Sequence, residues 1–263
     1  MCIICTGDYD INLTKLNCSN CKQIKEIPKE LINLTKIICY RTRIKEIPKE
    51  LVNLTYLNCM MTNIKEIPKE LVNLVELDCT STKVKEIPKE LINLNELELC
   101  YTKVKEIPKE LINLNELELC YTKVKEIPKE LINLTYLEIN YTKVKEIPKE
   151  LIKLTNLDCF STEIKEIPKE LINLNILDCQ YTEIKEIPKE LINLNEVSNP
   201  PDTIWDRSWF KTEDDIDKII KLQKYWKKNV KFITNSSTLW KIAEYYTAKK
   251  YSPENILKYI DLE

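Results

Sequence analysis

The heptapeptide KEIPKEL at residues 45–51 decides the fold, because it recurs along most of the chain at a constant spacing. The copies start 20 residues apart, at Lys25, Lys45, Lys65, Lys85, Lys105, Lys125, Lys145, Lys165 and Lys185. A repeat of roughly 20–50 residues is typical of a solenoid, in which one repeat cannot bury its apolar side alone but stacked repeats can. We therefore expect each repeat to form one coil that packs against the next.

One complete repeat, residues 54–73, reads LTYLNCMMTNIKEIPKELVN. Apolar residues at Leu54, Leu57 and Cys59 alternate with polar ones, which predicts a short strand with one buried face. The proline at the equivalent of Pro48 fixes φ and donates no hydrogen bond, so it starts the return path, and the PKEL segment is compatible with one helical turn. Stacking predicts an α/β solenoid with a concave parallel β-sheet and short convex turns.

The pattern L-x-x-L-x-C-x-x-T-x-I resembles the leucine-rich repeat family, whose consensus is L-x-x-L-x-L-x-x-N/C-x-L, over roughly residues 11–197. The 20-residue length and the I-P-x-x-L segment resemble the short repeats of bacterial effector proteins. The nearly identical copies rich in Lys, Ile and Asn also look like the repeat arrays of giant DNA viruses. The resemblance implies a leucine-rich repeat horseshoe that binds a protein partner and has no enzymatic activity.

Two features depart from the family pattern. Threonine replaces the family's asparagine, whose side chain forms a ladder of hydrogen bonds to the next coil; a hydroxyl can continue such a ladder with less reach. The threonines are Thr42, Thr62, Thr82, Thr102, Thr122, Thr142, Thr162 and Thr182. The first repeat is one residue longer and has Cys21 at this position.

The sequence divides into four parts. Residues 1–12 are expected to be an N-terminal cap or partial repeat, and residues 13–197 a solenoid of about nine to ten repeats. Residues 198–211 contain Asn199-Pro200-Pro201 and are expected to be a linker. Residues 212–263 show helical periodicity and predict a three-helix unit that caps the open apolar end of the solenoid.

Composition narrows the possible chemistry. The chain has no His, which excludes His-based catalysis and His metal ligands, and only one Gly, which excludes a glycine-rich phosphate loop. The net charge is −2, and we expect neither nucleic acid nor a membrane as partner, nor a signal peptide or transmembrane helix. Eleven Cys in a chain without an expected signal peptide favour reduced thiols and an intracellular, cytoplasmic location in the producing or infected cell.

The outward strand positions predict an acidic, tyrosine-lined concave face that is the candidate binding surface. Its residues are Tyr56, Glu76, Asp78, Glu96, Glu98, Tyr101, Glu116, Glu118, Tyr121, Glu138, Tyr141, Asp158, Phe160, Asp178 and Tyr181. Like charges stack between adjacent strands about 4.8 Å apart and repel, so the alternative is that the face was simply copied with the repeats. We expect these carboxylates to be solvent-exposed, with no single pKa selectively raised, which argues against acid–base catalysis.

The cysteines suggest three different environments. Cys18, Cys39, Cys59, Cys79, Cys159 and Cys179 share an inward position with Leu99, Leu119 and Ile139, so they are expected to be small core residues. Cys2-x-x-Cys5 and Cys18-x-x-Cys21 have a spacing near that of four-thiolate zinc sites, but Cys18 and Cys21 also have structural roles, and we predict no metal or cofactor. Cys100 and Cys120 are expected to be exposed thiols on the concave face.

The sequence therefore predicts a non-enzymatic protein-interaction module whose concave face binds a partner with a basic surface. One alternative is an adaptor or specificity subunit that recruits a second protein through its C-terminal helices. Another is a structural array expanded by duplication that has no defined ligand.

Overall fold

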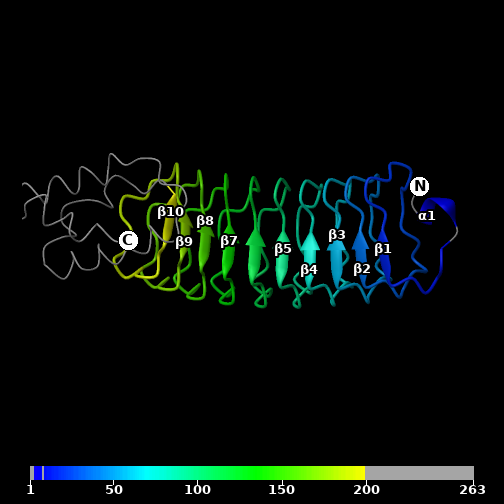
Figure 1. Cartoon of the computed structure of the whole chain (residues 1–263), viewed down its shortest axis with the longest axis horizontal. Coiled ribbons are helices and arrows are strands. Elements are labelled where there is room, and N and C mark those ends of the chain that lie inside the picture. Colours follow the sequence, from blue (N-terminus) through cyan, green and yellow to red (C-terminus); the bar gives the residue numbers. More distant parts are fainter. Residues whose placement is uncertain (1–2, 8, 199–263) are drawn as a thin grey trace, which may run out of the picture. The chain divides into compact units, whose positions relative to one another are not determined.

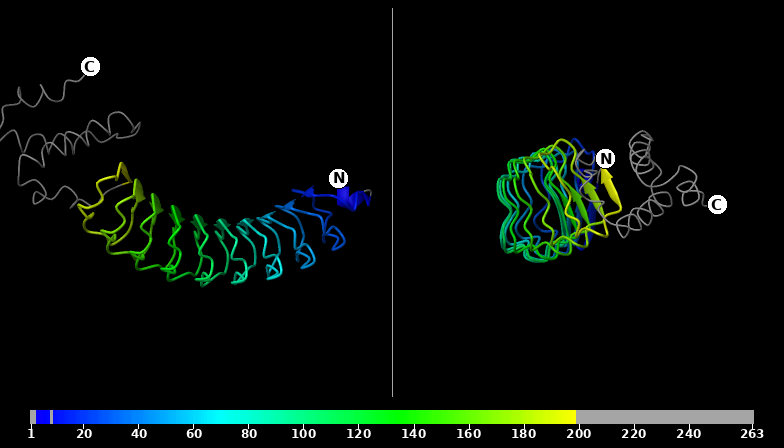
Figure 2. Two further views of the ribbon diagram at one scale, coloured as in Figure 1. Left: turned by 90° about the horizontal axis from the view of Figure 1, so that it is seen from below. Right: turned by 90° about the vertical axis from the view of Figure 1, so that its left-hand side faces the viewer.

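The computed structural model describes residues 3–7 and 9–198, which form a short helix followed by a ten-stranded parallel sheet in sequence order (Figure 1). The elements are α1 (Ile3–Thr6), β1 (Lys15–Asn17), β2 (Lys36–Ile38), β3 (Tyr56–Asn58), β4 (Glu76–Asp78), β5 (Glu96–Glu98), β6 (Glu116–Glu118), β7 (Tyr136–Glu138), β8 (Asn156–Asp158), β9 (Ile176–Asp178) and β10 (Glu196–Ser198). Within the array, the coils follow an arc with the strands on its inner side (Figure 2). The expected parallel sheet on the concave face is confirmed.

The strands pair without any register shift, so each residue lies beside its equivalent one coil away. Glu96 pairs with both Glu76 and Glu116, and Leu97 with Leu77 and Leu117. Between β1 and β2 the offset is 21 residues, because the first repeat is one residue longer. Side chains at the same repeat position therefore form a column along the sheet.

The core is one continuous stack of aliphatic columns. In the coil around β6, the side chains of Leu111, Leu114, Leu117 and Leu119 are fully buried, and the same cluster extends from Leu16 to Leu194. Each of these residues contacts equivalents above and below, which is how a repeat of only 20 residues obtains a core. Burial of this apolar surface is the main driving force for stacking.

The return path contains two hydrogen-bonded turns, and the expected helical turn is wrong. The amide of Leu51 donates to the carbonyl of Pro48 (3.3 Å), and the amide of Leu54 donates to the carbonyl of Leu51 (3.1 Å). The same pair of turns recurs in the following coils. Leu51 and Leu54 are both fully buried, and each i→i+3 turn ends on a leucine that enters the core.

The threonine column does not form a ladder between coils, contrary to expectation. The Thr42 hydroxyl donates to the carbonyl of Cys39 in its own coil (2.7 Å), and Thr62 and Thr142 do the same with Cys59 and Ile139. A hydroxyl on one carbon reaches a carbonyl three residues back but not the next coil.

An asparagine ladder lies instead before the strands, at a position that the repeat pattern did not predict. Asn53 Nδ2 donates to the carbonyl of Ile32 in the preceding coil (3.0 Å), and Asn113 Nδ2 donates to that of Ile92 (2.9 Å). Equivalent bonds come from Asn73, Asn93, Asn133, Asn173 and Asn193. The longer amide carries two donors and can bridge the spacing between coils.

At the N-terminal end, Ile4 and Cys5 of α1, together with Tyr9 and Leu13, pack against the first coil. The assignment of residues 1–12 as a cap or partial repeat stays a prediction. The linker and three-helix unit expected over residues 198–263 lie outside the described residues from Asn199 onward. Within the described part, no helix is both long enough and apolar enough to cross a membrane.

Two aliphatic residues in one coil provide a direct test of this fold. Leu117 is fully buried and Ile112 is 49% exposed. We expect Leu117→Ala to lower the free energy of unfolding by about 2–5 kcal/mol, because it leaves a cavity between coils. Ile112→Ala should lower it by less than about 1 kcal/mol. Urea denaturation followed by circular dichroism measures both, and equal losses would contradict the assignment of inner and outer positions.

Candidate functional site

The exposed face of the sheet carries a column of carboxylates, which we call the acidic column. It consists of Asp78, Glu98, Glu118, Glu138, Asp158 and Asp178, each at the last position of its strand. A shorter column of Glu76, Glu96 and Glu116 runs beside it at the first strand position. Both positions flank the buried middle residue and therefore point away from the core, and the in-register pairing places like charges side by side.

The acidic column is not freely exposed, which corrects the expectation from sequence. Burial, together with repulsion from the neighbouring carboxylates of Asp78 and Glu118, raises the pKa of Glu98 to about 7. Burial also raises the pKa of Glu118, with Glu138 adding repulsion. Side chains of the adjacent columns screen these carboxylates from water, and solvent therefore stabilises the charged form less well. The interior of a repetitive column can thus differ electrostatically from its ends.

The part of the acidic column in β7 and β8, toward the C-terminal end of the array, is held by hydrogen bonds. Glu138 Oε2 accepts a bond from the Tyr136 hydroxyl (3.0 Å), and Glu138 Oε1 accepts one from Asn140 Nδ2 (3.0 Å). Asn140 Nδ2 also donates to Asp158 Oδ2 (2.9 Å) and so bridges two carboxylates. The amide of Phe160 donates to Asp158 Oδ1 (3.2 Å). These contacts offset part of the repulsion, and the pKa of Asp158, although raised by burial, is lowered by its bonds to Asn140 and Phe160.

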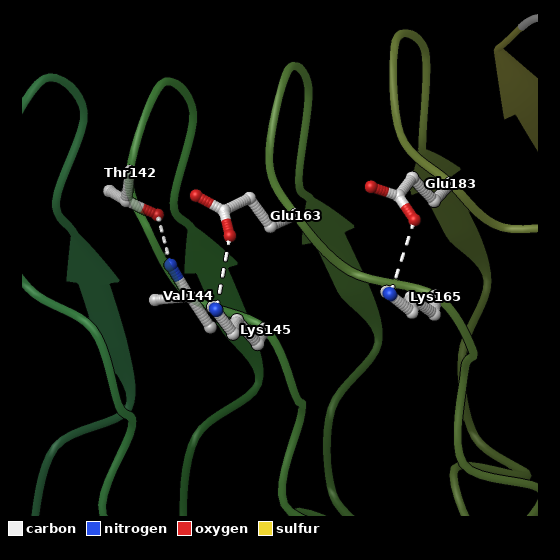
Figure 3. A network of polar contacts seen from close by, with 6 residues as sticks. All are labelled: Thr142, Val144, Lys145, Glu163, Lys165 and Glu183. Carbon is white, nitrogen blue, oxygen red and sulfur yellow. Dashed lines mark hydrogen bonds and ion pairs between the residues drawn. The ribbon is translucent and has the colours of Figure 1, made fainter.

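Glu98 and Glu118 lack such support. No side chain or amide of the described residues is within hydrogen-bonding distance of either carboxylate. The two ion pairs of the described part, Lys145–Glu163 (3.3 Å) and Lys165–Glu183 (3.4 Å), lie off the sheet face and on exposed side chains (Figure 3). The centre of the acidic column therefore has a charge that nothing in the array compensates.

An aromatic row runs beside the acidic column, as the sequence predicts, and its rings are in contact. The Tyr101 and Tyr121 rings stack with centroids 4.6 Å apart, and the Tyr121 and Tyr141 rings with centroids 4.2 Å apart. The row continues through Phe160, which lies 5.2 Å from Tyr141 and 5.1 Å from Tyr181. Phe160 sits one position earlier in its coil than the tyrosines and fills the gap left by a serine at position 161.

The tyrosines project from a strained backbone position. Tyr101, Tyr121, Tyr141 and Tyr181 have φ between 55° and 60°, in the left-handed region that residues other than Gly, Asn and Asp rarely adopt. The equivalent residue in every coil from Asn20 onward shows the same conformation. The bend after each strand leaves these four rings on the exposed surface as the chain leaves the sheet.

Cys100 and Cys120 are buried, so the expectation of exposed thiols is wrong. Each is 8% exposed. The amide of Cys120 donates to Cys100 Sγ (3.2 Å), and Cys120 Sγ donates to Glu138 Oε1 (2.6 Å). A thiol is short, and the longer Glu and Tyr side chains of the flanking columns screen it. The pKa of Cys120 is raised, first by its contact with Cys100 and then by burial and Glu138.

The remaining cysteines behave largely as expected. Cys39, Cys59, Cys79, Cys159 and Cys179 are core residues, and burial raises the pKa of the Cys39 and Cys159 thiols. Cys18 is also in the core, and Cys5 Sγ lies 3.4 Å from Cys21 Sγ. Residues 3–7 and 9–198 contain no group of three or more side chains arranged to hold a metal ion, while Cys2 lies outside them. The zinc hypothesis for the four cysteines stays untested.

The N-terminal part of the concave face carries basic residues, a feature that was not predicted from the sequence. Lys15 and Lys36 pair in register on β1 and β2, and Lys36 Nζ lies 3.5 Å from the centre of the Tyr56 ring. Asn58 Nδ2 donates to Asp78 Oδ2 (2.7 Å). Tyr56, a predicted binding residue, is therefore already engaged by a cation of its own chain. The alternation Lys-x-Asn and Lys-x-Ile in the first two strands was the signal for this change.

Comparison with known proteins agrees with this geometry. The family model described as Leucine Rich Repeat matches residues 12–34, and no curated protein has a significantly similar sequence. The functional domain of InlJ from Listeria monocytogenes, which includes a cysteine ladder, is 26% identical with a TM-score of 0.67 over 72% of this chain and 45% of its own. The Leptospira interrogans LRR protein LIC12759 is 27% identical with a TM-score of 0.55 over 71% and 60%.

The plant peptide hormone receptor RGFR1, solved in complex with RGF2, shares the fold at 24% identity. Its TM-score is 0.56, over 70% of this chain and 39% of the receptor. The chain spans less than two thirds of the length of each of these three proteins.

The raised pKa of Glu98 predicts a pH-dependent stability. The folded-state pKa of about 7 lies above the ordinary value near 4.3, so the folded chain binds this proton more tightly than the unfolded chain does. The stability contribution is complete below about pH 4 and is lost as the pH rises through about 7. We expect Glu98→Gln to raise the thermal midpoint at about pH 8 and to reduce its change between about pH 4.5 and 8.

The effect should be no more than a few degrees, because the side chain is half-exposed and solvent screens the repulsion. The matched control is Glu106→Gln, an exposed residue of the return path before its first turn, which should leave the pH dependence unchanged. Differential scanning calorimetry over this pH range measures both variants. Parallel profiles for wild type and Glu98→Gln would contradict the raised pKa.

Proposed function

Since the repeat array is a leucine-rich repeat solenoid, a fold that typically serves protein–protein interaction, we propose that this chain is a non-enzymatic binding module. Its binding surface is the concave face between β4 and β9, and its ligand is a protein segment rich in Lys or Arg. The observation that carries the proposal is the pair of half-buried carboxylates, Glu98 and Glu118, that no group of the array compensates.

The chemistry of the surface suits cationic side chains. A Lys or Arg that approaches Glu98 and Glu118 would favour the charged form of both and would remove the repulsion within the column. Arg can donate hydrogen bonds to two carboxylate oxygens at once, and its planar group also stacks on aromatic faces. The adjacent ring row from Tyr101 to Tyr181 supplies such faces, as the contact of Lys36 with Tyr56 illustrates within the chain.

The surface also has the properties of a preorganised interface. Its side chains are mounted on short strands in a continuous parallel ladder, and the aromatic rings already contact one another. Ordering costs on binding are therefore small. Aromatic residues in a row at the centre of a patch are typical of interface hot spots. Nucleic acid is disfavoured because phosphates would meet carboxylates.

Three further expectations from the sequence concern an adaptor role, a structural array and the location of the protein. The adaptor hypothesis depends on helices outside the described residues and stays a prediction. The structural-array hypothesis accounts for repeated carboxylates but gives no reason for the aromatic row to stay continuous where a serine at position 161 interrupts the tyrosines. The intracellular location expected from the cysteine content stays a prediction.

Neutral substitutions test the proposal. The double variant Glu98→Gln/Glu118→Gln keeps the shape of both side chains and removes their charge. We expect it to weaken binding of a fluorescent Arg- and Lys-rich peptide by about tenfold, because two partly desolvated ion pairs are lost. Binding by the wild type should also weaken as salt is raised. Fluorescence anisotropy with the full chain measures both effects.

The control variant is Glu106→Gln/Glu126→Gln, which removes the same charge from exposed positions of the return path and should bind as the wild type does. Affinity capture from cytosolic extract with the same three proteins then identifies the partner. A partner retained equally by all three would place the binding site elsewhere. Failure of the wild type to bind the basic peptide or any protein would overturn the proposal.

A further inference from the structure

A second surface runs along the edge of the array where the strands begin, and the proposed function does not use it. The residue after the buried leucine of each KEIPKEL segment is aliphatic in all nine copies. This aliphatic ridge consists of Ile32, Val52, Val72, Ile92, Ile112, Ile132, Ile152, Ile172 and Ile192. Eight of these residues are between 40% and 51% exposed, and Ile192 is 77% exposed.

The fold does not require aliphatic residues here. Each ridge residue occupies the first corner of the second turn, between two leucines that are buried; in one coil, Leu51 and Leu54 flank Val52. Turn corners facing solvent are usually polar. Single exposed apolar residues need no explanation, but a contiguous row of this kind on a folded protein marks an interaction surface.

The ridge is rigid and evenly spaced. The carbonyl groups of Ile32, Val52 and Ile92 accept the bonds of the asparagine ladder from the following coil, and so do those of Val72, Ile112, Ile152 and Ile172. Seven of the nine ridge residues are thus tied to the next coil through their own backbone, whereas Ile132 lacks this bond because Lys153 replaces the asparagine of the following coil. A row fixed in this way loses little freedom when it is covered.

The charges beside the ridge narrow the choice of occupant. The corner of the first turn carries one Lys and one Glu in every coil, for example Lys109 and Glu110 beside Ile112. A strongly acidic or basic partner gains nothing from such a balanced border, and neither does an anionic membrane. A second border with equal numbers of Lys and Glu meets it without net repulsion and offers a partner of opposite sign for each charge.

The dimensions favour a second copy of the chain. At about half exposure, nine aliphatic residues present on the order of 800 Å², close to the roughly 800 Å² that each partner contributes to a standard interface. A second ridge has the same spacing between coils by construction, so its side chains can interdigitate along the whole row. Interfaces that use the same patch on both copies are the commonest kind in homo-oligomers.

We propose that the aliphatic ridge is the contact surface of a homodimer, in which two copies of the array pack edge to edge. The acidic column stays accessible in this dimer, because it lies on the sheet face and not at the turn edge. The inference is independent of the proposed function, since the two surfaces share no residue.

The test compares three forms of the full chain by sedimentation equilibrium and light scattering. The ridge variant is Ile92→Asn/Ile112→Asn/Ile132→Asn, and circular dichroism with thermal melting verifies that it remains folded. The control is Tyr101→Ser/Tyr121→Ser/Tyr141→Ser, which removes three large exposed side chains from the concave face. We expect the wild type and control to form dimers, and the ridge variant to raise the dissociation constant about 100-fold because three buried contacts are lost.

A wild type that is monomeric at all concentrations would overturn the proposal. A dimer that survives in the ridge variant, or is lost in the control, would overturn it as well. Should the ridge variant fail to fold, the milder Ile112→Ala and Ile132→Ala changes give the same comparison with a smaller shift. Binding of wild-type monomers to lipid vesicles or to a different protein through the ridge would assign another occupant and would likewise reject the dimer.

Discussion

The structure depends on one constraint, which is that no coil can bury its leucines without an equivalent coil beside it. Leu97, Leu117 and Leu137 are shielded by one another, and the strands that carry them are hydrogen-bonded to one another in register. Such a core has no local unit that is stable by itself, and its stability is approximately a sum of contacts between nearest neighbours. The same constraint fixes the surface, because any residue at a given repeat position faces its equivalent about 4.8 Å away.

Surface columns of this kind bring both a cost and an opportunity. In the acidic column, repetition places carboxylates side by side. Only some of them have hydrogen-bond donors that offset the repulsion. Around Glu138 and Asp158 it places Tyr136 and Asn140 as donors, whereas around Glu98 and Glu118 it places none. Residues that depart from the repeat, such as Asn140 and Phe160, therefore mark where the surface carboxylates have hydrogen-bond donors within the chain. The unbroken coils are where an external partner has most to contribute.

Much of the fold could be predicted from the sequence because the period is constant. The spacing of KEIPKEL gave the number and order of the coils, and the alternation around Leu57 or Leu117 gave the inward and outward strand positions. The columns of Glu, Asp and Tyr followed directly from the register. Resemblance to leucine-rich repeats added the curvature of the sheet.

What escaped prediction depends on distances within a coil. The reach of a threonine hydroxyl compared with an asparagine amide decided which column bridges coils, and the sequence pattern alone assigned this role to the wrong residue. The depth of Cys120 and Glu98 depends on how far the neighbouring side chains extend over them, which no alternation pattern encodes. Ile112 and its equivalents are apolar, but only their place at a turn corner shows that they face outward.

The left-handed backbone conformation at the tyrosines of the aromatic row lowers the stability of the folded array. A side chain other than Gly, Asn or Asp at φ near 56° costs on the order of 1 kcal/mol, and Tyr101, Tyr121, Tyr141 and Tyr181 each bear this cost. The first coil has Asn20 there, which tolerates the conformation, and the chain has a single Gly, which lies elsewhere. Arg41, Met61, Ser81 and Ser161 bear the same cost in other coils. Replacement by Asn or Gly would therefore relieve the backbone at any of these positions, but only at the tyrosines would it also remove a ring from the row.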